Sequence, residues 1–114
     1  MILKTGEKIH VITRRNFEGD IRRHFIGEVI EASGSLARVA GYAFILDNMT
    51  NHYERRPDKR TRIISLADAG NIINILPENA DIENARYTQS KESKMVVTDS
   101  KSFSLDINEF GLTR

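Results

Sequence analysis

The sequence lacks cysteine, long apolar runs and a clear excess of charge of either sign. With no cysteine in 114 residues, disulfide scaffolds, thiol catalysis, zinc ribbons and iron–sulfur clusters are excluded. No apolar run approaches the roughly 20 residues that a membrane helix needs. Residues 1–8 have no signal-peptide core. We therefore expect a cytoplasmic protein with no membrane partner.

The charges that are present divide unevenly along the chain. The net charge is only +1, from 17 basic and 16 acidic residues. Residues 1–62 carry 12 basic and 8 acidic residues, whereas residues 63–114 carry 5 and 8. Arginine dominates the basic half, and its planar guanidinium suits phosphate better than the ammonium of lysine does. The plain alternative is a solvated surface of mixed charge.

Short segments rich in β-branched residues dominate the chain and show little sustained helical periodicity. This pattern, with 39% hydrophobic residues, predicts an all-β globular fold. Polar turns separate the segments, among them Ser33–Ser35 and a hairpin over Arg14–Arg23 with its tip at Gly19–Asp20. The expected strands are residues 7–13, 24–32, 36–46, 61–67 and 71–76.

The third of these segments contains Gly41, and glycine within a strand permits a bend or a bulge. Five strands with a bent third strand are what a small closed or nearly closed barrel requires. We therefore predict a five-stranded, strongly bent antiparallel small barrel over residues 1–77. Pro77 ends the last strand because proline cannot donate to a ladder.

Residues 78–114 differ in composition and are expected to form a C-terminal extension. Residues 78–87 predict a short helical turn or irregular chain, and the polar residues 88–94 read as a linker. Residues 95–98 and 101–107 flank Asp99–Ser100 and predict an added hairpin.

The expected strands over residues 36–46 and 71–76 are apolar on both faces, although a half-buried antiparallel strand needs one polar face. In the strand over 36–46, Tyr42 and Phe44 lie on one face and Val39 and Ala43 on the other. The outer apolar surface needs a cover, which either the C-terminal segment or a neighbouring subunit supplies. Unpaired barrel edges invite strand addition, which favours self-association.

Two stretches resemble the motifs of the Sm and Sm-like (LSm) proteins. Ala69–Leu76 resembles the second Sm motif, and Gly27–Ala32 is similar to the glycine-containing strand of the first. The resemblance covers about residues 6–77; similar short strands also occur in SH3-like and OB barrels. It implies a homo-oligomeric ring of about five to seven subunits, which binds single-stranded RNA and has no catalytic activity.

Two basic runs are the candidates for nucleic-acid binding. They are Arg22–Arg23 with His24, and the run from Arg55 to Arg62; the alternative is that both are solubilising loop charges. Phosphates would meet Arg22, Arg23, Arg38, Arg55 and Arg56, while Tyr53 would stack on a base. Asn71 is expected to bond a base edge or to serve as a turn residue. The resemblance also implies pore-loop positions for Ser35, Asp68 and Gly70.

Catalysis finds little support in the sequence. The histidines, His10, His24 and His52, are far apart, and His10 is expected on a strand surface. Acid pairs such as Glu28 with Glu31, or Asp81 with Glu83, have no accompanying base or nucleophile motif. We expect no cofactor and no metal. Two hypotheses remain: a non-catalytic RNA- or DNA-binding ring that acts in nucleic-acid processing, or a structural oligomer or protein-interaction module.

Overall fold

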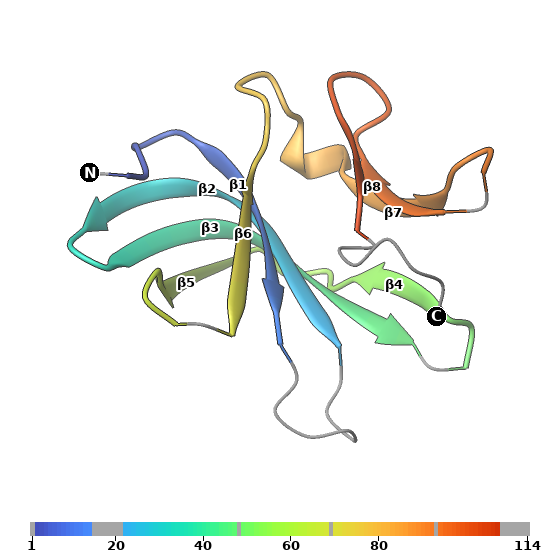
Figure 1. Ribbon diagram of the computed structural model, residues 1–114, viewed down its shortest axis with the longest axis horizontal. Helices are drawn as coiled ribbons and strands as arrows, with labels where there is room; N and C mark the ends of the chain where they lie inside the picture. Colours follow the sequence, from blue (N-terminus) through green and yellow to red (C-terminus); the bar gives the residue numbers. More distant parts are fainter. Residues whose placement is uncertain (1, 15–21, 48, 69, 93, 108–114) are drawn as a thin grey trace.

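A computed structural model describes residues 2–14, 22–47, 49–68, 70–92 and 94–107 as an antiparallel all-β protein with one short 3-10 helix (Figure 1). The predicted all-β, antiparallel class is therefore confirmed. The elements in chain order are β1 (Lys8–Thr13), β2 (Arg23–Ser33), β3 (Leu36–Asp47), β4 (His52–Arg55), β5 (Arg60–Ser65), β6 (Asn71–Ile75), η1 (Ile82–Asn84), β7 (Arg86–Gln89), β8 (Met95–Thr98) and β9 (Ser104–Asp106).

The first sheet has the order β4-β3-β2-β1-β6, and β5 pairs with β3 as well. One edge of β3 is thus shared, because residues 36–41 pair with β5 and residues 44–47 pair with β4. The second, smaller sheet has the order β7-β8-β9. Within the described residues, β5 and β6 each pair on one side only, so both are lateral strands of the first sheet.

Two glycines allow β2 and β3 to approach each other where β3 changes partner. Gly27 and Gly41 are directly opposed in the ladder, and a Cβ on Gly41 would lie 1.9 Å from the carbonyl oxygen of Ile26. The bend predicted at Gly41 therefore coincides with a backbone contact that no other residue allows. The register shift itself lies in β2, between Val29 and Glu31.

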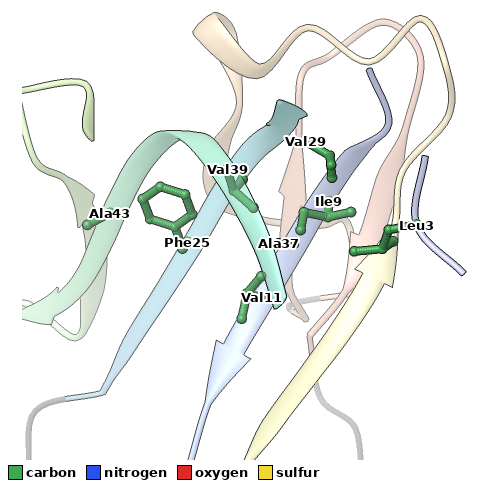
Figure 2. Packing of buried hydrophobic residues seen from close by; sticks show 8 residues of the cluster. All are labelled: Leu3, Ile9, Val11, Phe25, Val29, Ala37, Val39 and Ala43. Carbon is green, nitrogen blue, oxygen red and sulfur yellow. The ribbon is translucent and has the colours of Figure 1, made fainter. Parts of the chain in front are cut away.

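A first hydrophobic cluster fills one face of the first sheet, which we call the inner face (Figure 2). Ile9, Val11, Phe25 and Val39 alternate with outward residues on their strands, as the period of two requires. Leu3 packs against them from before β1 and is only 3% exposed.

A second cluster lies between the opposite face of the first sheet, the outer face, and the segment that follows β6. From the sheet it takes Ile26, Tyr42, Phe44 and Leu76. From the C-terminal segment, residues 78–107, it takes Ala80, Ile82, Ala85 and Val97. The outer apolar surface that the sequence left without a cover is thus covered by the chain itself.

The strand predictions differ from the structure at two places. β4 lies in the polar stretch after β3, and β7 occupies part of the expected turn and linker. Both strands have only four residues, and the one large apolar side chain in each is a half-buried tyrosine, Tyr53 or Tyr87. The sequence of these segments therefore shows no alternation of apolar and polar residues. The predicted hairpin of residues 95–98 and 101–107 is present as β8 and β9. The tip at Gly19–Asp20 lies outside the described residues.

Candidate functional site

The predicted phosphate-binding arginines at the start of β2 and after β4 are exposed. Arg22 precedes β2, Arg23 opens it, and Arg56 follows β4. The backbone N–H of Arg56 donates to the carbonyl oxygen of Ala43 at 2.8 Å, which fixes the chain there while leaving the guanidinium in solvent. These three side chains are sterically open to a phosphate.

Arg38 and Arg55, in contrast, hold contacts within the chain. Arg38 Nη1 lies 2.8 Å from Glu31 Oε1, and both side chains are exposed. Arg55 Nη1 donates to the backbone carbonyl of Glu83 at 2.6 Å, and its guanidinium lies 4.4 Å from the centre of the Tyr42 ring. A phosphate at either arginine would compete with these contacts, so both are weaker candidates than Arg22, Arg23 and Arg56.

Glu83 on η1 neutralises part of the positive charge around β4 and β5. The Tyr42 hydroxyl donates to Glu83 Oε1 at 2.7 Å, and Lys59 Nζ donates to Oε2 at 3.1 Å. These two hydrogen bonds lower the pKa of the Glu83 carboxyl and keep it ionised. The same carboxylate raises the pKa of Lys59. Glu83 thus joins the C-terminal segment to the long basic run.

Three arginines share the inner face of the first sheet, and none of them forms an ion pair with a described residue. Arg23 lies two residues before Phe25 on β2, while Arg60 and Arg62 lie opposite Gly41 and Val39. The guanidinium of Arg62 lies 5.3 Å from the centre of the Phe25 ring. The sequence identified Arg60 and Arg62 only as part of a charged run, because the pairing of β5 with β3 decides which face they occupy.

The three residues in the expected pore loops, Ser35, Asp68 and Gly70, form one connected turn system with Asn71. Asp68 Oδ1 accepts the N–H of Gly70 at 2.7 Å. The Asn71 amide donates to the carbonyl of Ser65 at 3.2 Å, and the carbonyl of Ser35 accepts the N–H of Leu66 at 2.6 Å. The loops after β2 and after β5 are therefore neighbours. Asn71 closes this turn through its backbone N–H and is the first residue of β6, and its role in base recognition stays a prediction.

Tyr53, the predicted base-stacking residue, belongs to an aromatic group under the C-terminal segment. Its ring is half-buried and stacks on His24 and on Tyr87, with 4.6 Å between ring centres in both cases. Phe44 lies beside the same group, 5.1 Å from Tyr87. Base stacking on Tyr53 stays a prediction, and this packing restricts how a base could approach it.

The prediction that His10 lies on a strand surface is wrong. His10 has no exposed area and His24 is 7% exposed, because the C-terminal segment covers the outer face. The pairing of β1 with β2 places His10 opposite Ile26 and His24 opposite Ile12, so both histidines lie on the outer face, with 5.2 Å between ring centres. One signal in the sequence points to this burial: both histidines lie among apolar residues in segments that were expected to be strands.

One hydroxyl serves both histidines. Tyr87 Oη lies 2.9 Å from His10 Nε2 and 2.6 Å from His24 Nδ1, and the Asn74 amide nitrogen lies 3.2 Å from His10 Nδ1. Burial lowers the pKa of His10 to about 4. Burial, with the charges of His10 and Arg22, lowers the pKa of His24 to about 3. Both imidazoles are therefore neutral at pH 7.

The described residues hold neither a metal-binding group nor a membrane-spanning helix. Across the part of the chain that the structure describes, no three histidines or carboxylates are grouped so that they could hold a metal ion. No helix there is long and apolar enough to cross a membrane. Comparison of the chain with known protein families, curated protein sequences and solved structures found no match.

Proposed function

We propose that this chain is a non-catalytic protein that binds single-stranded nucleic acid, RNA in the first place and DNA as the alternative, as a homo-oligomeric ring. The observation that carries the proposal is the group of arginines on the inner face. Only two ion pairs occur among the described residues, Arg38–Glu31 and Lys59–Glu83. Neither involves Arg23, Arg60 or Arg62, so their charges are available to phosphates.

The surroundings of these arginines suit a single strand. Arg62 already lies over the ring of Phe25, and a guanidinium on an aromatic face is a common platform for bases and phosphates. Asn71 is aligned with Arg23 across β1, because Thr13 pairs with both residues. Neighbouring strands lie about 4.8 Å apart, so Arg23 and Asn71 lie within about 10 Å of each other along one row.

Ring formation is supported by the two lateral strands of the first sheet. Ile63 on β5 is 63% exposed, and Ile72 and Ile75 on β6 are 40% and 56% exposed. An open edge with apolar side chains is suited to pairing with a second chain. Pairing β5 of one copy with β6 of the next is a head-to-tail contact, which closes into a ring when the rotation fits. The exposed arginines of each inner face would then repeat around the ring and form a continuous basic track.

The fold that this proposal assigns to residues 1–77 is the small, strongly bent barrel of the Sm-like type. Its five strands would be β1, β2, β3, β5 and β6, in the order in which the sequence predicts them. The hydrogen bond from Asn71 to Ser65 supports it, because it joins the end of β5 to the start of β6. The cytoplasmic setting stays a prediction.

Replacing Arg23 and Arg60 with alanine is expected to weaken RNA binding and to reduce its dependence on salt. Each phosphate contact to a single strand contributes about 0.7 to the slope of log K against log salt, so loss of two contacts lowers its magnitude by about 1.4. Fluorescence anisotropy of a labelled uridine-rich oligonucleotide over a salt series measures this slope. The same series on the matching DNA tests the choice of RNA.

The matched control removes two positive charges elsewhere. Lys91 and Lys94 are exposed and lie in the turn between β7 and β8, away from the inner face. Replacing both with alanine should leave the slope nearly unchanged. Equal slopes for the two double variants would mean that the inner face is not the contact surface.

The second candidate, a structural oligomer without nucleic acid, rests on the same isoleucines. Exposed apolar residues on both lateral strands serve assembly whether or not the arginines bind anything. The ultraviolet spectrum of the purified protein separates the candidates. The chain has no tryptophan and three tyrosines, so co-purified nucleic acid would dominate its absorbance.

A further inference from the structure

We propose that His10, His24 and Tyr87 form an acid-sensitive latch that holds the C-terminal segment, residues 78–107, against the outer face of the first sheet. The two histidines belong to β1 and β2 of the first sheet, whereas the tyrosine belongs to β7 of the second. The hydroxyl of Tyr87 reaches both imidazoles, at 2.9 Å and 2.6 Å. The latch therefore joins the two sheets through a single polar atom.

The hydrogen bonds of this latch have one consistent direction. The Asn74 amide nitrogen can only donate, so His10 Nδ1 accepts and the proton of the neutral His10 ring is on Nε2. His10 Nε2 then donates to Tyr87 Oη, and the one hydroxyl proton of Tyr87 is donated to His24 Nδ1. Burial raises the pKa of Tyr87 well above its usual value, so this proton is retained. The chain is complete only while both imidazoles are neutral.

A further proton on either ring breaks this order. On His10 Nδ1 it would face the N–H of Asn74, and on His24 Nδ1 it would face the hydroxyl proton of Tyr87. Two donors then point at each other, or one group must turn and lose its partner. A positive charge would also stand in a space with almost no solvent contact, next to a second imidazole.

The other ionisable groups around the pair do not supply a buried counter-charge. On the outer face of the bordering strands these are Lys8, Arg22, Glu28, Tyr42, Tyr53 and Arg55, with Arg86 on β7. Tyr42 and Arg55 are both hydrogen-bonded to Glu83. Glu28 is exposed and lies opposite Lys8, two residues along the ladder from His10. Only burial lowers the pKa of His10, and the one charged side chain that acts on His24 is the positive Arg22. The rings of Tyr53 and Tyr87 pack against His24, and both tyrosines lie against the apolar second cluster.

The direction of the pH effect follows from these pKa values. A free histidine has a pKa of 6.5, above the values of about 4 and about 3 in the closed state. Between pH 6.5 and about pH 4, the open state therefore binds the protons and the closed state does not. The stability of the closed state is complete above pH 6.5 and decreases as the pH falls.

Opening of the latch leaves the inner core intact. The first cluster takes all of its members from residues 3–73, and none comes from the C-terminal segment. The second cluster, which the latch borders, takes Ala80, Ile82, Ala85 and Val97 from that segment. Protonation therefore releases residues 78–107 and exposes Ile26, Tyr42 and Phe44 while the first sheet keeps its inner face packed.

The natural chain already carries a suitable probe. It has no tryptophan, and its three tyrosines, Tyr42, Tyr53 and Tyr87, all lie at the junction with the C-terminal segment. Near-ultraviolet circular dichroism thus reports on the latch, and far-ultraviolet circular dichroism reports on the strands. Between about pH 7 and about pH 5, opening should become more favourable about 20-fold for each histidine and about 400-fold for the pair. The near-ultraviolet transition in urea should move to lower urea at pH 5 and precede the far-ultraviolet one.

Neutral replacements test the assignment. His10→Gln keeps a donor near the Nε2 position and His24→Asn keeps an acceptor near Nδ1, so the double variant should lose most of the pH-dependent shift. His52→Gln, which removes an exposed histidine on β4, should keep the shift. An unchanged shift in the double variant, or near- and far-ultraviolet transitions that coincide at both pH values, would overturn the latch.

The unaltered chain gives a second measurement should the double variant not fold. Nuclear magnetic resonance of the imidazole carbon-bound protons should show His10 and His24 taking up protons in the same pH interval in which the tyrosine signal is lost. Protonation of both rings with the tyrosine signal unchanged would contradict the proposal.

Discussion

Replacing Gly41 with alanine is expected to destabilise the protein by more than about 4 kcal/mol, a large share of the stability of a small domain. The added Cβ would lie 1.9 Å from the carbonyl oxygen of Ile26 and 2.5 Å from Gly27 Cα. Both are backbone atoms in the middle of a ladder, so no side chain can rotate to make room. The bend of β3, and with it the pairing to both β5 and β4, depends on this position.

Urea denaturation followed by far-ultraviolet circular dichroism measures this effect, with Gly34→Ala as the control. Gly34 has a positive φ of 59° and no atom within 4 Å of its Cβ position, so alanine there meets only backbone strain of about 1 kcal/mol. A Gly41→Ala variant that is no less stable than the control would show that β2 and β3 are not this close.

The second large effect is expected from Asp99→Asn, which should destabilise the protein by about 3 kcal/mol. Asp99 is only 2% exposed, and its carboxylate accepts the N–H groups of Asp81, Lys101, Ser102 and Phe103. The hydroxyl of Ser102 donates to it as well. An asparagine amide group would point a donor at some of these donors. The loss should therefore loosen the turn of β8 and β9 and the start of η1 together.

Asp99 loses its stabilising effect at a lower pH than the two histidines do. Burial favours the neutral acid, yet the hydrogen bonds from Ser102 and from the backbone N–H groups outweigh it and hold the pKa well below its usual value of 3.8. Its stabilising effect is therefore complete above about pH 4 and is lost only in stronger acid. Asp58→Asn, at an exposed position before β5, is the control and should change urea stability by less than about 0.5 kcal/mol.

The strands with strong local patterns could be predicted from the sequence. Alternation and turn residues predicted β1, β2, β3, β5 and β6 to within two residues of their ends. These strands carry their own apolar residues, so the signal is present in each segment alone. β4 and β7 were missed because each depends on a partner strand and on one aromatic side chain under the second sheet.

The histidine cluster could not be predicted, for a related reason. His10 and Tyr87 are 77 residues apart in the chain, and His24 and Tyr87 are 63 apart. Their contact depends on the C-terminal segment folding back over the outer face. The face occupied by Arg60 and Arg62 is equally non-local, because the register of β5 against β3 decides it. The basic run could be recognised in the sequence. The sequence did not show that Arg55 and Lys59 contact Glu83, whereas Arg60 and Arg62 form no ion pair with a described residue.

The central claim is that this chain forms a ring that binds single-stranded nucleic acid, and light scattering coupled to size-exclusion chromatography tests it most directly. The chain of 13.0 kDa is run at low salt with and without a short uridine-rich RNA. A ring of about five to seven copies would have a mass of about 65 to 91 kDa and should gain mass with RNA. Ile63→Lys should reduce it to a monomer, whereas Met49→Lys, at an exposed apolar residue outside β5 and β6, should not. A natural chain that stays at 13.0 kDa and gains no mass with RNA would contradict the proposed function.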